Sequence, residues 1–157
     1  MALIVQKYGG TSVGSVERIN HVAERVMATR AQGHQLVVVV SAMSGETNRL
    51  VSLAKSIADP PKAREFDVLL ATGEQVTIGL LSIALEAKGC PARSYTGAQV
   101  HILTDDAYTK ARILEIDNKR MHADLAQDIV VVVAGFQGVD QKGNITTLGR
   151  GGSDTTA

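Results

Sequence analysis

Two unbroken apolar runs constrain the fold of this chain more than any other feature of its sequence. Residues 36–40 (LVVVV) and 129–134 (IVVVVA) contain only aliphatic side chains, and neither run alternates with polar residues. A strand that is apolar on both faces has to be covered on both faces, which is typical of parallel sheets flanked by helices. We therefore expect these runs to be buried parallel strands. Weaker strands are expected at residues 3–5, 92–95 and 111–114.

Helical patterns lie between the strand-like runs. Apolar residues recur at three- and four-residue spacing over residues 15–32, 47–57 and 118–127. A longer apolar stretch, 60–89, opens on two prolines that suit a first helical turn, and its interior Gly73 predicts two helices or a kink. The alternation of strands and helices predicts a layered α/β/α sandwich with a mostly parallel sheet.

The composition excludes several functional classes. Lys plus Arg and Asp plus Glu both total 16, so the net charge of zero argues against a nucleic-acid binder that works through a broad basic field. No apolar run approaches the roughly 18 residues of a membrane span, so no membrane partner is expected. The four histidines show no metal-ligand spacing. The single cysteine, Cys90, cannot form an internal disulfide, which favours a reducing, cytoplasmic location.

Glycine and hydroxyl residues follow several of the expected strands. They occur in residues 7–12 (KYGGTS), 41–48 (SAMSGETN) and 135–138 (GFQG), and a further glycine loop lies at 149–152 (GRGG). Ligands of open parallel sheets bind beyond the carboxyl ends of the strands, where such loops share one edge. The sequence therefore predicts one polar site at this edge.

The first of these loops suits a phosphate group. Glycines allow backbone N–H groups to approach an anion closely, and Lys7 adds a positive charge at the end of the strand. The alternative is a tight turn beside a solvated lysine. Neither common nucleotide motif is complete, because Ser15 and Val16 replace the P-loop Lys-Ser/Thr and Asp154 replaces the last glycine of the dinucleotide motif.

Two charged residues suggest a small zwitterionic ligand. Glu74 lies in the most apolar helical stretch, where a carboxylate needs a partner or a cleft, and it could accept from an ammonium or hydroxyl group. The alternative is an exposed helix position. Arg150 lies between glycines and could hold a carboxylate through two hydrogen bonds. Ser153 and Asp154 follow at a helix start, where at least one of them acts as a cap.

Several segments together resemble the N-terminal part of bacterial aspartate kinases, which have the amino-acid kinase fold. The resemblance runs in order along the whole chain, and its first and last segments are the most specific. The segments are 7–12 (KYGGTS), 39–43 (VVSAM), 73–74 (GE), 95–97 (YTG), 135–138 (GFQG) and 147–154 (TLGRGGSD).

The resemblance implies that ATP, with Mg²⁺ bridging its phosphates, phosphorylates the side-chain carboxylate of L-aspartate to 4-phospho-L-aspartate. This reaction opens the routes to lysine, threonine and methionine. By position, Lys7 and Asp154 would be catalytic. The cofactor contacts would be Lys7, Tyr8, Gly9, Gly10, Ser12 and Ser41, and the substrate contacts Thr47, Glu74, Arg150, Gly151 and Ser153. Glu74 would bind the ammonium group of aspartate, and Arg150 its α-carboxylate.

The resemblance also implies a division of the protein. Residues 1–157 would be the N-terminal, aspartate-binding lobe, and the nucleotide-binding half and regulatory domains would follow Ala157 in a full-length protein that is a homo-oligomer. The lobe alone is then expected to lack kinase activity. Two alternatives stay open. One is another amino-acid kinase, such as one acting on acetylglutamate, and the other is a non-catalytic amino-acid-binding or dimerisation lobe.

Overall fold

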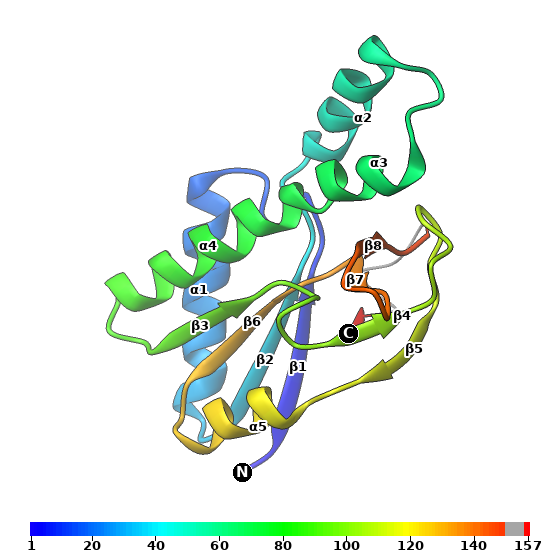
Figure 1. Cartoon of the computed structure of the whole chain (residues 1–157). Coiled ribbons are helices and arrows are strands. Elements are labelled where there is room, and N and C mark those ends of the chain that lie inside the picture. Colours follow the sequence, from blue (N-terminus) through cyan, green and yellow to red (C-terminus); the bar gives the residue numbers. More distant parts are fainter. Residues whose placement is uncertain (150–155) are drawn as a thin grey trace.

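The computed structural model describes residues 1–149 and 156–157, and it is built around a parallel sheet (Figure 1). The strand order is β1-β2-β6-β3, and all neighbours are parallel. The strands are β1 (Leu3–Tyr8), β2 (Gln35–Val40), β6 (Val130–Ala134) and β3 (Ala92–Tyr95). The two apolar runs therefore form the adjacent central strands, as expected.

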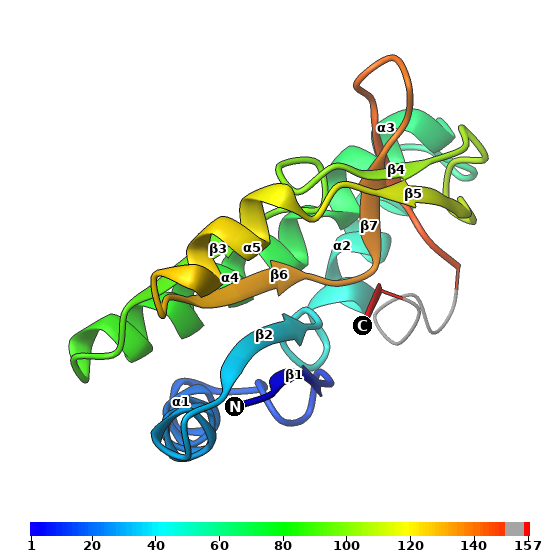
Figure 2. The same ribbon diagram turned by 90° about the horizontal axis from the view of Figure 1, so that it is seen from below.

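Both faces of the central strands are buried. Val38 and Val132 face α1 (Val16–Ala31) and α4 (Thr72–Ala87), which pack together on one side. Val39 and Val131 face the opposite side, where α5 (Lys119–Ala126) contributes Leu125. The view from below shows α1 and α5 on opposite sides of the sheet (Figure 2). This arrangement confirms the predicted α/β/α layering.

The long apolar stretch divides as predicted, although not at the glycine. Helix α2 (Glu46–Ile57) is followed by α3 (Ala63–Leu70) and α4, with the break at Ala71. Gly73 lies in the first turn of α4 and does not interrupt the helix. The prolines at 60 and 61 precede α3 and do not begin it, since Lys62 is its N-cap.

A second, smaller sheet lies beyond the carboxyl ends of β6 and β3 (Figure 1). Its order is β5-β4-β7-β8, from β5 (Ile113–Ile116), β4 (Ile102–Thr104), β7 (Gln137–Val139) and β8 (Ile145–Thr147). The sequence predicted only a strand near β5. The other three have three residues each, which is too short for a periodic pattern.

The stretch Ala63–Ala87 is long and apolar enough to cross a membrane by length and composition, contrary to the expectation from the sequence. Half of an 18-residue apolar segment within this stretch is buried inside the protein. Leu81 and Leu85 of α4 are fully buried in the core beside α1 and the sheet. Packing against the sheet accounts for the apolar character of this segment.

Candidate functional site

The first two loops pack directly against each other at the carboxyl ends of β1 and β2. The Ser41 N–H donates to the Tyr8 carbonyl oxygen (3.1 Å), and the Ser44 N–H donates to the Gly10 carbonyl oxygen (3.1 Å). A Cβ atom on Gly10 would lie 3.0 Å from the Ala42 carbonyl oxygen. The close approach of the two backbones therefore depends on glycine at position 10.

Lys7 lies at the edge of this loop pair. It is exposed near the end of β1, and its Nζ lies 3.6 Å from the position that a Cβ atom on Gly9 would occupy. The ammonium group therefore lies beside the glycines. A cation next to glycine backbone, in the loop that leads to α1, is a suitable arrangement for an anionic group.

A pocket of about 270 Å³ lies between the second loop, α2 and α4. It brings together several of the residues singled out from the sequence, with loop and helix residues around them. The lining consists of Gly10, Ser41, Ala42, Met43, Ser44, Gly45, Thr47, Asn48, Glu74 and Phe136. The expectation that the loops converge on one polar site is met for Gly10, Ser41, Thr47 and Glu74.

Glu74 is the buried acid of this pocket. It lies in the first turn of α4 with 2% of its surface exposed, so it is not an exposed helix residue. Burial raises its pKa to about 8, although hydrogen bonds from its own backbone, the Gln137 side chain and the Ala42 backbone favour the charged form. Without a ligand, the pocket therefore holds mainly a neutral carboxyl group at neutral pH. An ammonium ligand would favour its ionisation.

Gln137 fixes the surroundings of Glu74, although nothing in the sequence assigns a role to it. Its Nε2 donates to the Ala71 carbonyl oxygen (3.0 Å) and to Glu74 Oε2 (3.4 Å). Its Oε1 accepts from the Gly97 N–H (3.4 Å). The sequence pattern of residues 135–138 indicates only a glycine loop. A glutamine shortly after an apolar strand is the available signal, and it does not identify a partner.

Gly73 brings α4 close to the second loop. A Cβ atom on Gly73 would lie 2.9 Å from the Ala42 Cβ and 3.6 Å from Leu50 Cδ1 of α2. The helix can therefore approach this closely only with glycine at position 73. This contact sets the depth at which the neighbouring Glu74 enters the pocket.

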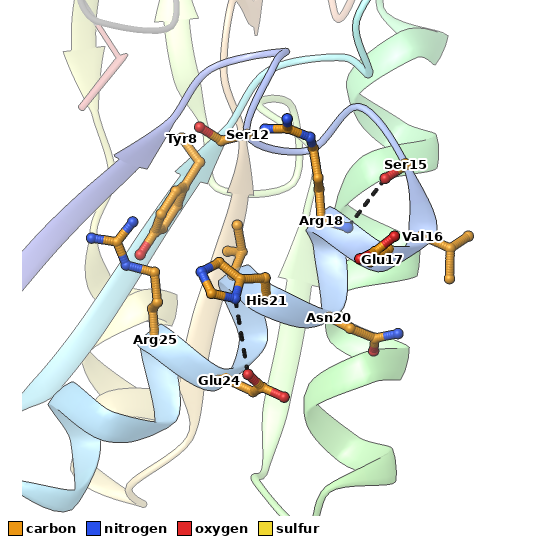
Figure 3. Close-up of a pocket in the computed structure, with 11 residues that line it drawn as sticks. Tyr8, Ser12, Ser15, Val16, Glu17, Arg18, Asn20, His21, Glu24 and Arg25 are labelled. Atoms are coloured by element: carbon orange, nitrogen blue, oxygen red, sulfur yellow. Dashed lines mark hydrogen bonds and ion pairs between the residues drawn. The ribbon is translucent and has the colours of Figure 1, made fainter.

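Tyr8 and Ser12 lie elsewhere. They line a separate, broader depression of about 850 Å³ along α1, shown in Figure 3 with Arg18, His21 and Arg25. Tyr8 Oη donates to Gln6 Oε1 (3.0 Å), and burial raises the pKa of this phenol. Neither residue lines the Glu74 pocket.

Four of the expected site residues, Arg150, Gly151, Ser153 and Asp154, lie outside the described residues. Leu148 precedes them in the sequence and Thr156 follows them. Both are hydrogen-bonded to the backbone of Phe136, which lines the Glu74 pocket. The Leu148 N–H donates to the Phe136 carbonyl oxygen (2.8 Å), and the Phe136 N–H donates to Thr156 Oγ1 (3.3 Å).

Among residues 1–149 and 156–157, no three His, Cys, Asp or Glu side chains gather as metal ligands. Glu74 is also a poor ligand for Mg²⁺, because it is largely protonated at neutral pH and engaged with Gln137. The described residues do not by themselves form a magnesium site.

The chain is similar to known proteins along its whole length. Residues 2–157 match the amino acid kinase family. An aspartate kinase of Stutzerimonas stutzeri is 69% identical over 156 residues, which are 99% of this chain and 38% of that protein. The chain thus spans well under half the length of this relative.

Solved structures share the fold. The aspartate kinase of Synechocystis is 52% identical with a TM-score of 0.86, and the match covers 99% of this chain and 25% of that one. A structure of E. coli aspartokinase III in complex with aspartate and ADP is 25% identical with a TM-score of 0.87. That match covers all of this chain and 45% of the other.

Proposed function

This chain belongs to the amino acid kinase family, and from that premise we propose that it is the aspartate-binding lobe of an aspartate kinase. The reaction is ATP plus L-aspartate to ADP plus 4-phospho-L-aspartate. The relatives named aspartate kinase support this assignment at identities up to 69%. The nucleotide-binding half would belong to the part of the relatives that this chain does not span.

The observation that carries the proposal is the buried carboxyl group of Glu74 in a pocket bounded by loop hydroxyls. A pocket of about 270 Å³ suits a small molecule, and Ser41 and Thr47 line it beside Glu74. A buried acid at this place offers a partner for one ammonium group. An α-amino acid supplies that group, whereas a nucleoside monophosphate or an N-acetylated amino acid does not.

In this proposal Glu74 binds the ammonium group of aspartate and ionises as it does so. Since its pKa is about 8 without ligand, binding at neutral pH releases a proton from the pocket. Thr47 contacts the substrate from the start of α2. Arg150 holds the α-carboxylate, and Gly151 and Ser153 complete the substrate loop.

The phosphoryl transfer needs no protein nucleophile. An oxygen of the substrate side-chain carboxylate attacks the γ-phosphorus, the bond to the β-phosphate oxygen breaks, and ADP leaves. Lys7 beside Gly9 and Gly10 would neutralise charge on the transferring group, Ser41 would contact the phosphates, and Asp154 would orient the reacting groups. Positioning and charge neutralisation dominate such reactions.

ATP and Mg²⁺ belong to the same proposal. Use of a nucleotide is supported by the family and by the ADP in the E. coli neighbour. When bound, Mg²⁺ would reduce the negative charge of the phosphates. No described residue is assigned to it.

The test is an assay of a full-length protein that contains this chain. ADP release is measured with aspartate, glutamate and acetylglutamate as acceptors, and hydroxylamine is added to trap an acyl phosphate as its hydroxamate. Aspartate-dependent ADP release with hydroxamate formation supports an acyl-phosphate product. ADP release only with acetylglutamate would identify a different kinase, and aspartate binding without any turnover would identify a non-catalytic lobe.

A further inference from the structure

Asp67 is a completely buried carboxylate that the proposed chemistry does not use. It lies in α3 with 0% of its surface exposed. The Thr147 Oγ1 donates to Asp67 Oδ1 (2.7 Å), and the Thr147 N–H donates to Oδ2 (2.9 Å). The Thr109 N–H donates to both oxygens, at 3.1 and 3.0 Å.

These contacts join α3 to the end of the second sheet. Thr147 is the last residue of β8, and Thr109 lies in the loop between β4 and β5. Leu148, directly after Thr147, donates to the Phe136 carbonyl oxygen at the edge of the Glu74 pocket. Arg150, which we propose to hold the substrate carboxylate, is three positions after Thr147 in the sequence.

The helix that carries Asp67 is also directly connected to the helix that carries Glu74. Helix α3 is separated from α4 only by Ala71, whose carbonyl oxygen accepts from Gln137. Glu74 follows in the first turn of α4. A single carboxylate therefore links the strand that precedes Arg150 to the pair of helices that carries Glu74.

A second polar contact lies on the same face of α3. Arg64, three residues before Asp67, donates through Nε to Asn144 Oδ1 (2.9 Å) in the turn between β7 and β8. Residues at this spacing lie side by side on a helix. The Arg64 contact is partly exposed and contributes little. Loss of the Asp67 carboxylate would instead leave the two buried donors of Thr147 unpaired.

From this geometry we infer that Asp67 is a positioning residue for the amino-acid substrate. It fixes the end of β8 relative to α4. Through the bond between Leu148 and Phe136, it also fixes one wall of the pocket in which Glu74 binds the ammonium group of the substrate. Its removal weakens aspartate binding without touching the nucleotide. The inference rests on the proposed function.

The test compares three variants of the full-length protein. Asp67→Asn keeps the size of the side chain but replaces one acceptor oxygen with a donor that faces the Thr147 or Thr109 N–H. Thr147→Val removes only the hydrogen bond from the Thr147 hydroxyl group to Asp67. It tests the same contact if Asp67→Asn does not fold. Asp124→Asn is the matched control, because Asp124 is also buried and bonded to Arg93 and Tyr95, on α5 at the other end of the main sheet (Figure 1).

We expect Asp67→Asn to raise the KM for aspartate about tenfold or more, with the KM for ATP within about twofold and kcat within about threefold. Thr147→Val changes the aspartate KM in the same direction by a smaller factor. Asp124→Asn lowers the melting temperature and leaves the aspartate KM unchanged.

If both Asp67→Asn and Thr147→Val lower the melting temperature but leave the aspartate KM unchanged, Asp67 has a purely structural role. That result overturns this inference and leaves the proposed function intact. A wild-type protein that neither binds nor phosphorylates aspartate overturns the proposed function together with this role. A parallel rise in the KM values for aspartate and ATP also contradicts a role specific to the substrate side.

Discussion

The side-chain amide of Gln137 has only one orientation in which it can meet Glu74. The Ala71 carbonyl oxygen can only accept and the Gly97 N–H can only donate, so Nε2 must face Ala71 and Oε1 must face Gly97. Nε2 is then also the atom that lies 3.4 Å from Glu74 Oε2. Two backbone groups thus determine that Glu74 receives a hydrogen bond donor, which favours its ionised form.

We predict that Gln137→Leu raises the pKa of Glu74 further and weakens aspartate binding. The variant removes the donor and leaves the Ala71 and Gly97 backbone groups unpaired, at a cost of about 1–3 kcal/mol per buried group. The aspartate KM should rise, and the pH at which it is lowest should move upward. Kinetics over a series of pH values measure both. Gln75→Leu, at an exposed position of α4, is the control, and equal effects of the two variants would contradict this role.

We predict that Glu74→Gln stabilises the ligand-free chain, increasingly so with rising pH. The carboxyl group has a pKa of about 8 when folded and 4.5 ordinarily, so between these values only the folded state keeps the proton. The stability of the wild type therefore falls as pH rises through this window, at about 1.4 kcal/mol per pH unit for this group. The stability of Glu74→Gln does not fall in this way, because its side chain does not ionise. For the same reason it cannot form an ion pair with an ammonium group.

Urea unfolding of the 157-residue chain between pH 5 and pH 9 measures the difference. The gain should be small near pH 5, grow towards pH 8 and level off above it. Glu24→Gln, at an exposed position of α1, serves as the control and should follow the wild type. A constant difference between Glu74→Gln and the wild type at every pH would show that Glu74 ionises normally.

The main sheet could be predicted because its signal is local. Residues 36–40 and 130–134 are apolar on both faces, and this pattern has one common structural solution. The second sheet could not be predicted, because β4, β7 and β8 have only three residues each. Leu103 of β4 also pairs with Val139 of β7, which lies far from it in the sequence. Nothing in so short a segment specifies its partner.

Some residues of the candidate site could likewise be predicted from the sequence, and others could not. Lys7 and Glu74 are visible in the sequence because each places a charge in an unusual setting, after a strand or inside an apolar helix. Asp67 also lies in an apolar helical stretch and could have been found by the argument used for Glu74. Gln137 could not, since its importance comes from Ala71 and Gly97, which lie 66 and 40 residues away.

We predict that Lys7→Ala in the full-length protein lowers kcat about 10²–10³-fold, the range found when one donor to a developing charge is removed. Aspartate affinity should stay within about twofold, because Lys7 does not line the Glu74 pocket. Turnover assays and calorimetric titration with aspartate separate these effects. Lys88→Ala, at an exposed position after α4, is the control. Unaltered turnover in Lys7→Ala would contradict a catalytic role for Lys7.

We predict that the 157-residue chain alone has no aspartate kinase turnover. It spans 38% of the length of its Stutzerimonas relative, and the proposed adenine-binding half lies in the remainder. Weak aspartate binding should persist, since Thr47 and Glu74 are part of one formed pocket. Coupled ADP release and titration with aspartate measure the two properties. Turnover by the isolated chain at the rate of the full-length protein would contradict the division into two lobes.

Two glycines of α4 offer a matched test of how closely that helix must approach the second loop. A Cβ atom on Gly79 would have no neighbour within 4 Å, so Gly79→Ala should stabilise the chain by about 0.5–1 kcal/mol through helix propensity alone. Gly73→Ala gains the same propensity but places a methyl group 2.9 Å from the Ala42 Cβ, and overpacking of this kind costs about 1–3 kcal/mol.

The net effect of Gly73→Ala should therefore be destabilising, opposite in sign to that of Gly79→Ala. Because Ala42 lines the pocket beside Glu74, the displaced loop should also weaken aspartate binding, whereas Gly79→Ala leaves it unchanged. Unfolding midpoints and calorimetric titration of both variants measure these differences. If Gly73→Ala stabilises the chain as much as Gly79→Ala and binds aspartate normally, the loop yields to the methyl group and the depth of Glu74 does not depend on this contact.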